Sequence, residues 1–144
     1  MKKVFLGGTC NDSVWRSVLI PKLKIDYFNP VVEDWDEEAY KEELRQREIC
    51  DYCLYVITPC MIGAYSVAEA VDDSNKRPSK TIYCLLKHDC QVEEDSIFAT
   101  VIPHSFDKSQ LKSLDRVGKM VEMNGGKYFK SLEEVADYLN KEEI

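Results

Sequence analysis

Glu69 is the residue whose type and surroundings point most directly to chemistry. It lies among small apolar residues in the run Val67 to Val71, early in a predicted helix that follows a strongly apolar strand. Burying a carboxylate without a partner is costly, so a glutamate at this place needs a specific reason. Three interpretations stay open: a reactive group in a pocket, a salt-bridge partner of Arg16 or Arg47, and a solvated residue on the helix surface.

The loop Gly7-Gly8-Thr9 is the second feature with chemical potential, because it ends an apolar run and precedes a predicted helix. Glycines let a ligand approach the backbone closely, and the start of the following helix has free N–H groups. The spacing matches neither the GxGxxG motif of dinucleotide-binding proteins nor the phosphate-binding loop with its lysine. The loop predicts either a site for a small polar ligand or simply a tight strand-to-helix turn.

Three further polar residues are candidates for binding a ligand near these two features. Ser66 lies one helical turn before Glu69 and could hydrogen-bond with it. Arg16, near the start of the first predicted helix, could hold a phosphate or a carboxylate, or be an ordinary surface arginine. Asn29 stands at the end of the second predicted strand, where it could bond a sugar hydroxyl or form a turn.

The cysteines and histidines predict neither a metal site nor a bound cofactor. Cys50 and Cys53 have CxxC spacing, but no second ligand pair accompanies them, and the chain has only two histidines. His88 and His104 lie in an irregular stretch without the serine or cysteine pattern of a catalytic triad. With no secretory signal and a normal core, we expect the six cysteines to be reduced thiols.

The composition narrows the range of partners. The chain has 19 Lys and Arg against 26 Asp and Glu, a net charge of −7. Nucleic-acid duplexes and anionic membranes favour basic surfaces, so we expect neither, whereas a single nucleotide needs only one polar site. No apolar run approaches the ~20 residues of a membrane span, and the first apolar stretch is too short for a signal peptide. We therefore expect a cytoplasmic protein.

Strands and helices alternate along the whole chain. The apolar runs predict strands over 3–8, 25–32, 52–58, 81–86 and 127–129, and the intervening patterns predict helices over 14–23, 36–50, 65–75, 109–123 and 131–141. Asp12 and Ser13 can cap the first helix, which Pro21 should kink or shorten. The stretch 87–105 is irregular and partly acidic, and its composition predicts a loop or a lid.

This alternation predicts a single α/β domain over residues 1–144, with a five-stranded parallel sheet covered by helices on both faces. The flavodoxin-like strand order 2-1-3-4-5 is the most common solution for such a chain. Ligands bind such sheets beyond the carboxyl ends of the strands, where the strand order reverses. Here that place lies between the first and third strands, so the loops 7–12 and 58–63 should form the pocket.

Four blocks of residues together resemble the nucleoside 2-deoxyribosyltransferase-like family, and more specifically a branch common in bacteria and phages. The resemblance extends over nearly the whole chain, and its most specific part joins the third strand to the following helix. The blocks are residues 5–9, 27–32, 47–59 and 63–78.

The resemblance implies a flavodoxin-like enzyme that cleaves or exchanges the N-glycosidic bond of a (deoxy)nucleoside or nucleotide. It implies that Glu69 is the nucleophile and that Glu43, with Glu42 adjacent to it, is the acidic residue of the preceding helix. Gly63 stands where well-studied members have an aspartate that handles the leaving base, so recognition or protonation of the base must differ. Phe5 corresponds to an aromatic residue of the first strand and lacks a hydroxyl.

Some relatives borrow an asparagine or a terminal carboxylate from a neighbouring subunit, a part that Asn124 could play in a homo-oligomer. A small-molecule nucleoside or nucleotide is the expected partner. Two alternatives stay open: a non-catalytic module that binds or sequesters nucleotides, and a glycohydrolase of the NAD type on the same fold. The residues expected to bind substrate are Phe5, Gly7, Gly8, Thr9, Arg16, Asn29, Gly63, Ser66 and Asn124.

Overall fold

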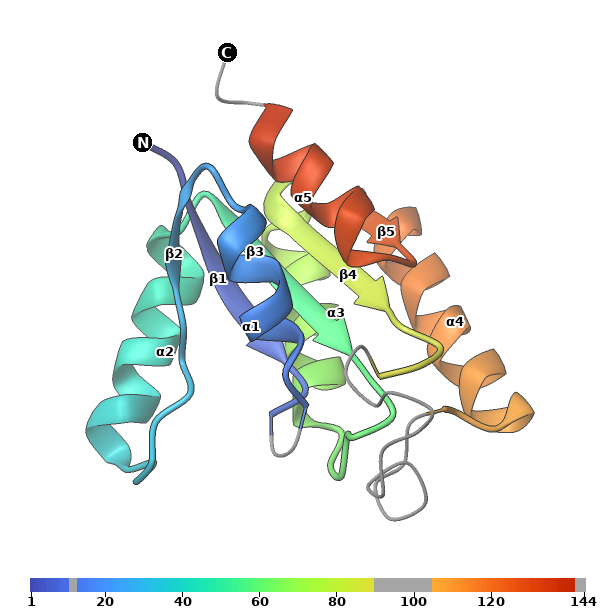
Figure 1. Cartoon of the computed structure of the whole chain (residues 1–144). Helices are drawn as coiled ribbons and strands as arrows, with labels where there is room; N and C mark the ends of the chain where they lie inside the picture. The colour runs from blue at the N-terminus through green and yellow to red at the C-terminus, as the bar shows by residue number, and fades with distance from the viewer. Residues whose placement is uncertain (11–12, 90–104, 142–144) are drawn as a thin grey trace.

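The computed structural model describes residues 1–10, 13–89 and 105–141. Its centre is a five-stranded, all-parallel sheet in the order β2-β1-β3-β4-β5, which confirms the predicted order (Figure 1). The strands are β1 (Lys3–Gly8), β2 (Asp26–Phe28), β3 (Tyr52–Ile57), β4 (Thr81–Leu85) and β5 (Lys127–Phe129).

Helices cover both faces of this sheet, as predicted. α1 (Trp15–Leu19) and α5 (Leu132–Lys141) lie on one face, and α3 (Tyr65–Lys76) and α4 (Lys108–Met123) lie on the other (Figure 1). α2 (Glu37–Ile49) lies beside α3, to which it is joined by ion pairs. Two short 3₁₀ turns, η1 (Ile20–Lys22) and η2 (Pro78–Lys80), follow α1 and α3.

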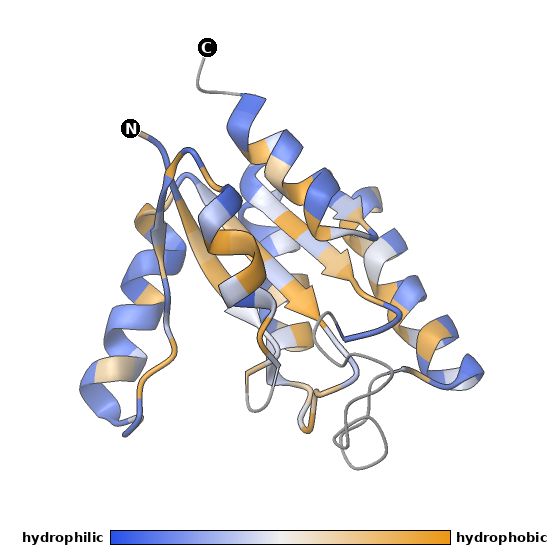
Figure 2. Cartoon of the chain, in the orientation of Figure 1, coloured by the Kyte–Doolittle hydropathy of each residue, from blue (hydrophilic) through white to orange (hydrophobic). Residues whose placement is uncertain are grey.

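The two layers of the core follow from side chains that alternate along each strand. In β3, Leu54 and Val56 face the α1 and α5 side, whereas Tyr55 and Ile57 face the α3 and α4 side. All six residues of β3 are buried, because both faces of the central strand are covered. Figure 2 shows the apolar residues concentrated on the sheet and on the helix surfaces that pack against it.

The first helix is shorter than predicted, and its predicted cap is wrong. The α-helix ends at Leu19, and Pro21 lies in the following 3₁₀ turn, because proline has no N–H to continue the helix. Val14 is the N-cap residue, and no side chain caps the helix. The Ser13 hydroxyl instead donates to Asp89, with 2.9 Å between the oxygens, and Asp12 lies outside the described residues.

The second strand is also shorter than the predicted range 25–32, since β2 covers only Asp26–Phe28. The chain turns at Asn29, whose side-chain oxygen accepts a hydrogen bond of 3.1 Å from the backbone of Val31. Pro30 cannot donate to a neighbouring strand, so pairing stops there. The remaining predicted boundaries agree with the structure to within one residue.

Residues 87–105 lie only partly within the described chain. His88 forms an isolated antiparallel bridge with Ser105, and residues 90–104 fall outside the description. A search of the described helices finds none with the length and apolar character needed to cross a membrane.

Candidate active site

A cleft of about 500 Å³ opens at the carboxyl end of β1, between the sheet, α2 and α3. It lies at the edge where the strand order reverses. Of the two loops predicted to form the pocket, the loop after β1 lines this cleft, whereas residues of the loop 58–63 line only a smaller neighbouring pocket. The residues that line it are Phe5, Gly7, Gly8, Cys10, Arg16, Pro30, Trp35, Tyr40, Glu43, Tyr65, Ser66 and Glu69.

Glu69 lies in the second turn of α3 and is buried, with 9% of its surface exposed. Its Oε2 is 3.6 Å from Nη1 of Arg47, so the salt-bridge partner is Arg47 rather than Arg16. The pKa of Glu69 is raised to about 7, chiefly by burial; Arg47 opposes this shift and nearby Glu43 contributes to it. The interpretation of Glu69 as a solvated surface residue is wrong.

Arg47 holds the cleft side of α2 against α3. Its Nε and Nη2 donate to the two carboxylate oxygens of Asp73 at 3.2 and 2.9 Å, and Nη2 also donates to Asp72 at 2.9 Å. Asp73 is fully buried and accepts further hydrogen bonds from the Tyr55 hydroxyl and from Arg77. This network fixes the guanidinium beside Glu69.

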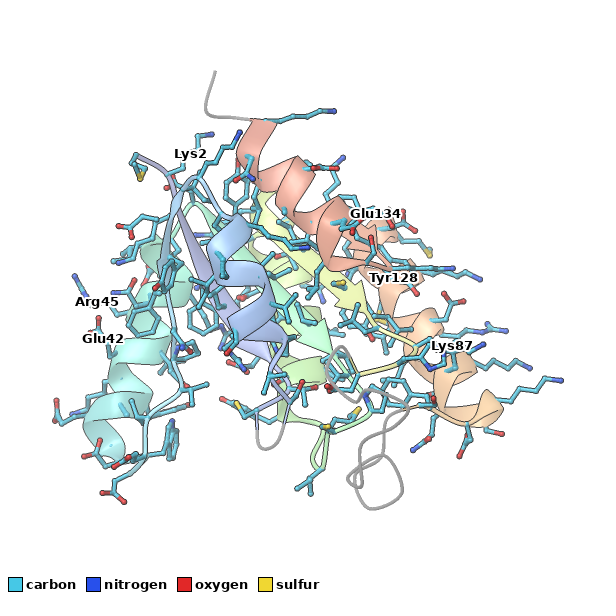
Figure 3. The ribbon with its side chains drawn as sticks, viewed as in Figure 1. Lys2, Glu42, Arg45, Lys87, Tyr128 and Glu134 are labelled. Carbon is cyan, nitrogen blue, oxygen red and sulfur yellow. The ribbon has the colours of Figure 1, made fainter. Side chains whose placement is uncertain are left out.

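Glu43 is the second carboxylate of the cleft, one helical turn before Arg47 on α2. Burial raises its pKa, whereas a hydrogen bond from Trp35 and the charges of Arg47 and Arg16 lower it. Glu42 instead accepts hydrogen bonds of 2.7 Å from Arg45 and Gln46, and Figure 3 shows Glu42 and Arg45 on the outer side of α2. The structure thus places Glu43, and not its neighbour, in the cleft.

Arg16 reaches the cleft, but its guanidinium is bound to the end of β1. Nε and Nη2 donate to the carbonyl oxygen of Leu6 at 3.1 and 2.9 Å, and Nη1 donates to that of Thr9 at 2.8 Å. The guanidinium also stacks 4.3 Å from the Trp15 ring. Arg16 therefore stabilises the loop after β1 and offers little donor capacity to a ligand.

Gly7 and Gly8 are both required by the fold. Gly8 has a φ of 116°, and a Cβ there would lie 2.2 Å from the carbonyl oxygen of Val56. A Cβ on Gly7 would lie 2.6 Å from the Tyr55 ring. The tight-turn interpretation is therefore correct, and both residues also line the cleft.

Thr9 and Gly63 lie in a smaller pocket of about 220 Å³ that adjoins the cleft and shares Gly8, Cys10, Tyr65 and Ser66 with it. The Thr9 hydroxyl accepts a hydrogen bond of 3.0 Å from the backbone of Thr58, which ties the loops after β1 and β3 together. Gly63 is exposed, and no atom lies within 4 Å of where a Cβ would be. The space for a larger side chain is present at Gly63.

Asn29 and Asn124 do not line the cleft. Asn29 is exposed and forms the turn after β2. Asn124 ends α4, where its Nδ2 donates to the Ser74 hydroxyl at 3.0 Å. Phe5 and Ser66 do line the cleft.

Sequence reasoning does not find the aromatic wall of the cleft, which consists of Trp35, Tyr40 and Tyr65. Trp35 packs edge-on against Tyr40, with 5.5 Å between ring centroids, and Trp35 and Tyr65 are more than half exposed. A signal was present, because Tyr40, Glu43 and Arg47 are spaced by three and four residues on one helix face.

Cys10 is exposed and lines the cleft, whereas the other described cysteines are buried. Cys53 is buried, and its thiol donates to the carbonyl oxygen of Arg47 at 3.1 Å. Cys50 and Cys53 are both free, and no group of three or more metal-ligating side chains occurs in ranges 1–10, 13–89 and 105–141.

The family model described as "Nucleoside 2-deoxyribosyltransferase like" matches residues 1–89. This range covers β1 to β4 and every residue that lines the cleft. No curated protein and no solved structure matches the chain. The matched range is more than half of the sequence, and the chain belongs to the nucleoside 2-deoxyribosyltransferase-like family.

Proposed function

We propose that this protein cleaves or exchanges the N-glycosidic bond of a (deoxy)nucleoside or nucleotide, with Glu69 as the nucleophile. The observation that carries the proposal is the Glu69 carboxylate, which is buried beside Arg47 and lines a cleft with a second carboxylate. The volume of about 500 Å³ is in the range of small-molecule sites.

In the first step, a carboxylate oxygen of Glu69 attacks C1′ of the sugar, and the bond between C1′ and the base nitrogen breaks. The bonding electrons leave with the base, which takes up a proton, and a glycosyl ester of Glu69 remains. Water or a second base then attacks C1′, and the bond between C1′ and the Glu69 oxygen breaks. The sugar is thereby transferred to water or to the second base, and the Glu69 carboxylate is restored.

Glu43 is the residue suited to manage the proton of the leaving base. Its raised pKa, caused chiefly by burial, keeps a larger fraction protonated near neutral pH than for an exposed glutamate. Arg47 favours the ionised form of Glu69, as a nucleophile requires. Burial raises the pKa of both carboxyl groups, that of Glu69 to about 7, so near neutral pH the interacting pair can hold one proton. The reaction needs that proton on Glu43 and the charge on Glu69, beside Arg47.

The aromatic wall suits a planar base. Trp35 packs against Tyr40, the side chains of Tyr40 and Tyr65 are hydrogen-bonded, and all three rings line the cleft. Stacking on such rings is tolerant of base identity, since every base has a flat apolar face.

Binding without turnover is the second candidate function, and Gly63 is the residue that favours it. The aspartate that family resemblance places there would help the base to leave, and at Gly63 the space is open but the carboxylate is missing. A nucleotide-binding module would use the same cleft and leave its ligand unchanged.

A cleavage assay distinguishes these functions. Purified protein is incubated with deoxynucleosides, ribonucleosides, their 5′-monophosphates and NAD, with and without a second free base, and released base is separated by chromatography. We expect base release or exchange with at least one substrate, and its loss in Glu69→Gln. The matched control is Glu133→Gln, an exposed glutamate on α5.

Intact-mass measurement after acid quenching provides a second readout, because the proposed ester adds one sugar to Glu69. If every panel member stays intact while a ligand still raises the melting temperature, the binding function replaces the catalytic one. Full activity in Glu69→Gln would reject Glu69 as nucleophile.

A further inference from the structure

A second hollow, of about 490 Å³, lies at the carboxyl ends of β4 and β5, against the first turns of α4. It shares no lining residue with the cleft or with the pocket that adjoins the cleft. Its volume is in the range of small-molecule sites. Nothing in the proposed reaction uses it.

Four lysines surround this hollow. Lys87 follows β4, Lys130 directly follows β5, and Lys108 and Lys112 lie one turn apart at the start of α4. Figure 3 shows Lys87 beyond the end of β4 and Tyr128 on β5, both toward α4. Three separate elements therefore bring positive charge to one place in a chain whose net charge is −7.

These lysines have no carboxylate partners among the described residues, where the salt bridges involve other cations. Asp115 lines the hollow but is bound by the Tyr128 hydroxyl at 2.7 Å and by Lys119 at 3.1 Å. Asp107 caps α4 by accepting from the backbone of Gln110 at 2.8 Å. All four lysines are exposed, so an anion in the hollow could pair with them without displacing a carboxylate of the described residues.

The floor of the hollow is apolar and rigid. Leu85, Leu111 and Tyr128 form it. Tyr128 packs on Gly118 of α4, where a Cβ would be only 2.5 Å from the ring, and its ring centroid is 5.5 Å from that of Tyr83. The Lys130 ammonium lies 5.8 Å from the centroid of the Tyr128 ring. An apolar floor with a cationic rim is complementary to a molecule with a flat body and an anionic group.

We propose that this hollow, called the lysine site below, binds a small phosphate-bearing molecule with a planar or apolar body, such as a nucleoside monophosphate. The body rests on Leu85, Leu111 and Tyr128, and the phosphate lies among the four lysines. The N-terminus of α4 is already capped by Asp107 and Gln110, so the lysines are the groups that would hold the anion. The lysine site is separate from the cleft and does not depend on the reaction proposed there.

Calorimetric titration with inorganic phosphate, pyrophosphate, adenosine and adenosine 5′-monophosphate tests the lysine site. We expect the monophosphate to bind more tightly than either adenosine or phosphate alone, and binding to weaken at high salt. Lys87→Gln and Lys112→Gln should each weaken it about fivefold, the effect of losing one partly exposed ion pair. The matched control is Lys41→Gln, an exposed lysine of α2.

A variant of the cleft keeps this result distinct from the proposed function. Trp35→Ala should leave monophosphate binding at the lysine site unchanged, whatever it does to base release. Equal losses in Lys41→Gln and Lys112→Gln, or loss of binding in Trp35→Ala, would overturn the lysine site. So would binding of poly-glutamate without binding of any of the four small molecules, which would indicate an acidic polypeptide partner instead.

Discussion

Arg47 and Glu69 face each other across the interface of α2 and α3, with 3.6 Å between Nη1 and Oε2. This distance is too long for a strong charge-assisted hydrogen bond, which measures roughly 2.7–2.9 Å. The short bonds of Arg47 go to Asp72 and Asp73. Arg47 therefore attracts the charge of Glu69 without occupying its oxygen atoms, and these stay available to a substrate.

Replacing Glu69 by glutamine should abolish activity and stabilise the fold above neutral pH. The pKa of Glu69 is about 7 in the folded protein and about 4.5 in the unfolded chain, so the folded protein binds the proton more tightly. The free energy of unfolding therefore falls as pH rises from about 4.5 to 7. Glu69→Gln should therefore gain up to about 3 kcal/mol over wild type at pH 8 and little at pH 4. Urea unfolding at both pH values measures the difference; an equal gain at pH 4 would contradict it.

The pH dependence of the reaction should report the ionisation of Glu69. A nucleophilic carboxylate must be ionised, so kcat/KM should rise with pH through an apparent pKa near 7. Because Glu43 and Glu69 interact, the profile describes the pair rather than one residue. Rates of base release from pH 5 to 9 provide the measurement, and a rise centred near pH 4.5 would argue against a buried nucleophile.

Replacing Arg47 by methionine should be strongly destabilising, because Asp73 is fully buried and would lose its main partner. The expected cost is about 3–5 kcal/mol in urea unfolding, and Arg47→Met with Asp73→Asn should recover part of it. Arg45→Met, an exposed arginine on the same helix, should cost less than about 1 kcal/mol.

Arg47→Lys separates charge from geometry in this network. It keeps a positive charge near Glu69 but loses the forked contact with Asp73. We expect the rising limb of the pH profile to move less in Arg47→Lys than in Arg47→Met. A purely structural role for Arg47 would lower the amount of folded protein and leave the position of the limb unchanged.

Trp35→Ala should weaken substrate binding without unfolding the protein. The side chain is 57% exposed, so little apolar burial is lost, whereas a base stacked on it would lose one wall of its site. We expect KM to rise about tenfold, corresponding to about 1.4 kcal/mol of stacking. Tyr27→Ala, an exposed aromatic residue of β2, should leave KM unchanged.

Gly63→Asp should restore the carboxylate that well-studied members of the family have at this position. The open space around Gly63 means that the substitution should change stability by less than about 1 kcal/mol. We expect the ratio of base exchange to hydrolysis to change, which is measured as nucleoside product against free sugar with a second base present. An unchanged ratio would show that the leaving base does not reach the pocket that contains Gly63.

The sheet and the position of the cleft could be predicted because they depend on patterns that are local in the sequence. The run Tyr52–Ile57 is uniformly apolar, which only a strand buried on both faces requires. The strand order and the carboxyl-edge site follow from the alternation of elements. Glu69 was identifiable because a charge among small apolar residues needs a partner.

The remaining features depend on contacts between residues far apart in the sequence. The predicted cap at Ser13 failed because its hydroxyl bonds with Thr58 and Asp89, which local propensity cannot reveal. The choice of Arg47 over Arg16 as the partner of Glu69 depends on how α2 docks on α3. Trp35 could not be predicted as part of the site, because an exposed aromatic residue before a helix has no distinctive sequence pattern.

α2 buries only Gln46 and Arg47 along its length, and its apolar residues Leu44 and Ile49 stay largely exposed. The helix that bears Tyr40 and Glu43 is therefore held to the protein mainly by the ion pairs of Arg47 with Asp72 and Asp73. Its separation from the protein exposes little apolar surface. Local unfolding of α2 should need less free energy than global unfolding, chiefly the cost of separating Arg47 from buried Asp73, so its amide hydrogens should exchange before those of β3. One wall of the cleft can thus separate from the protein while the sheet that bears the rest of the site stays folded.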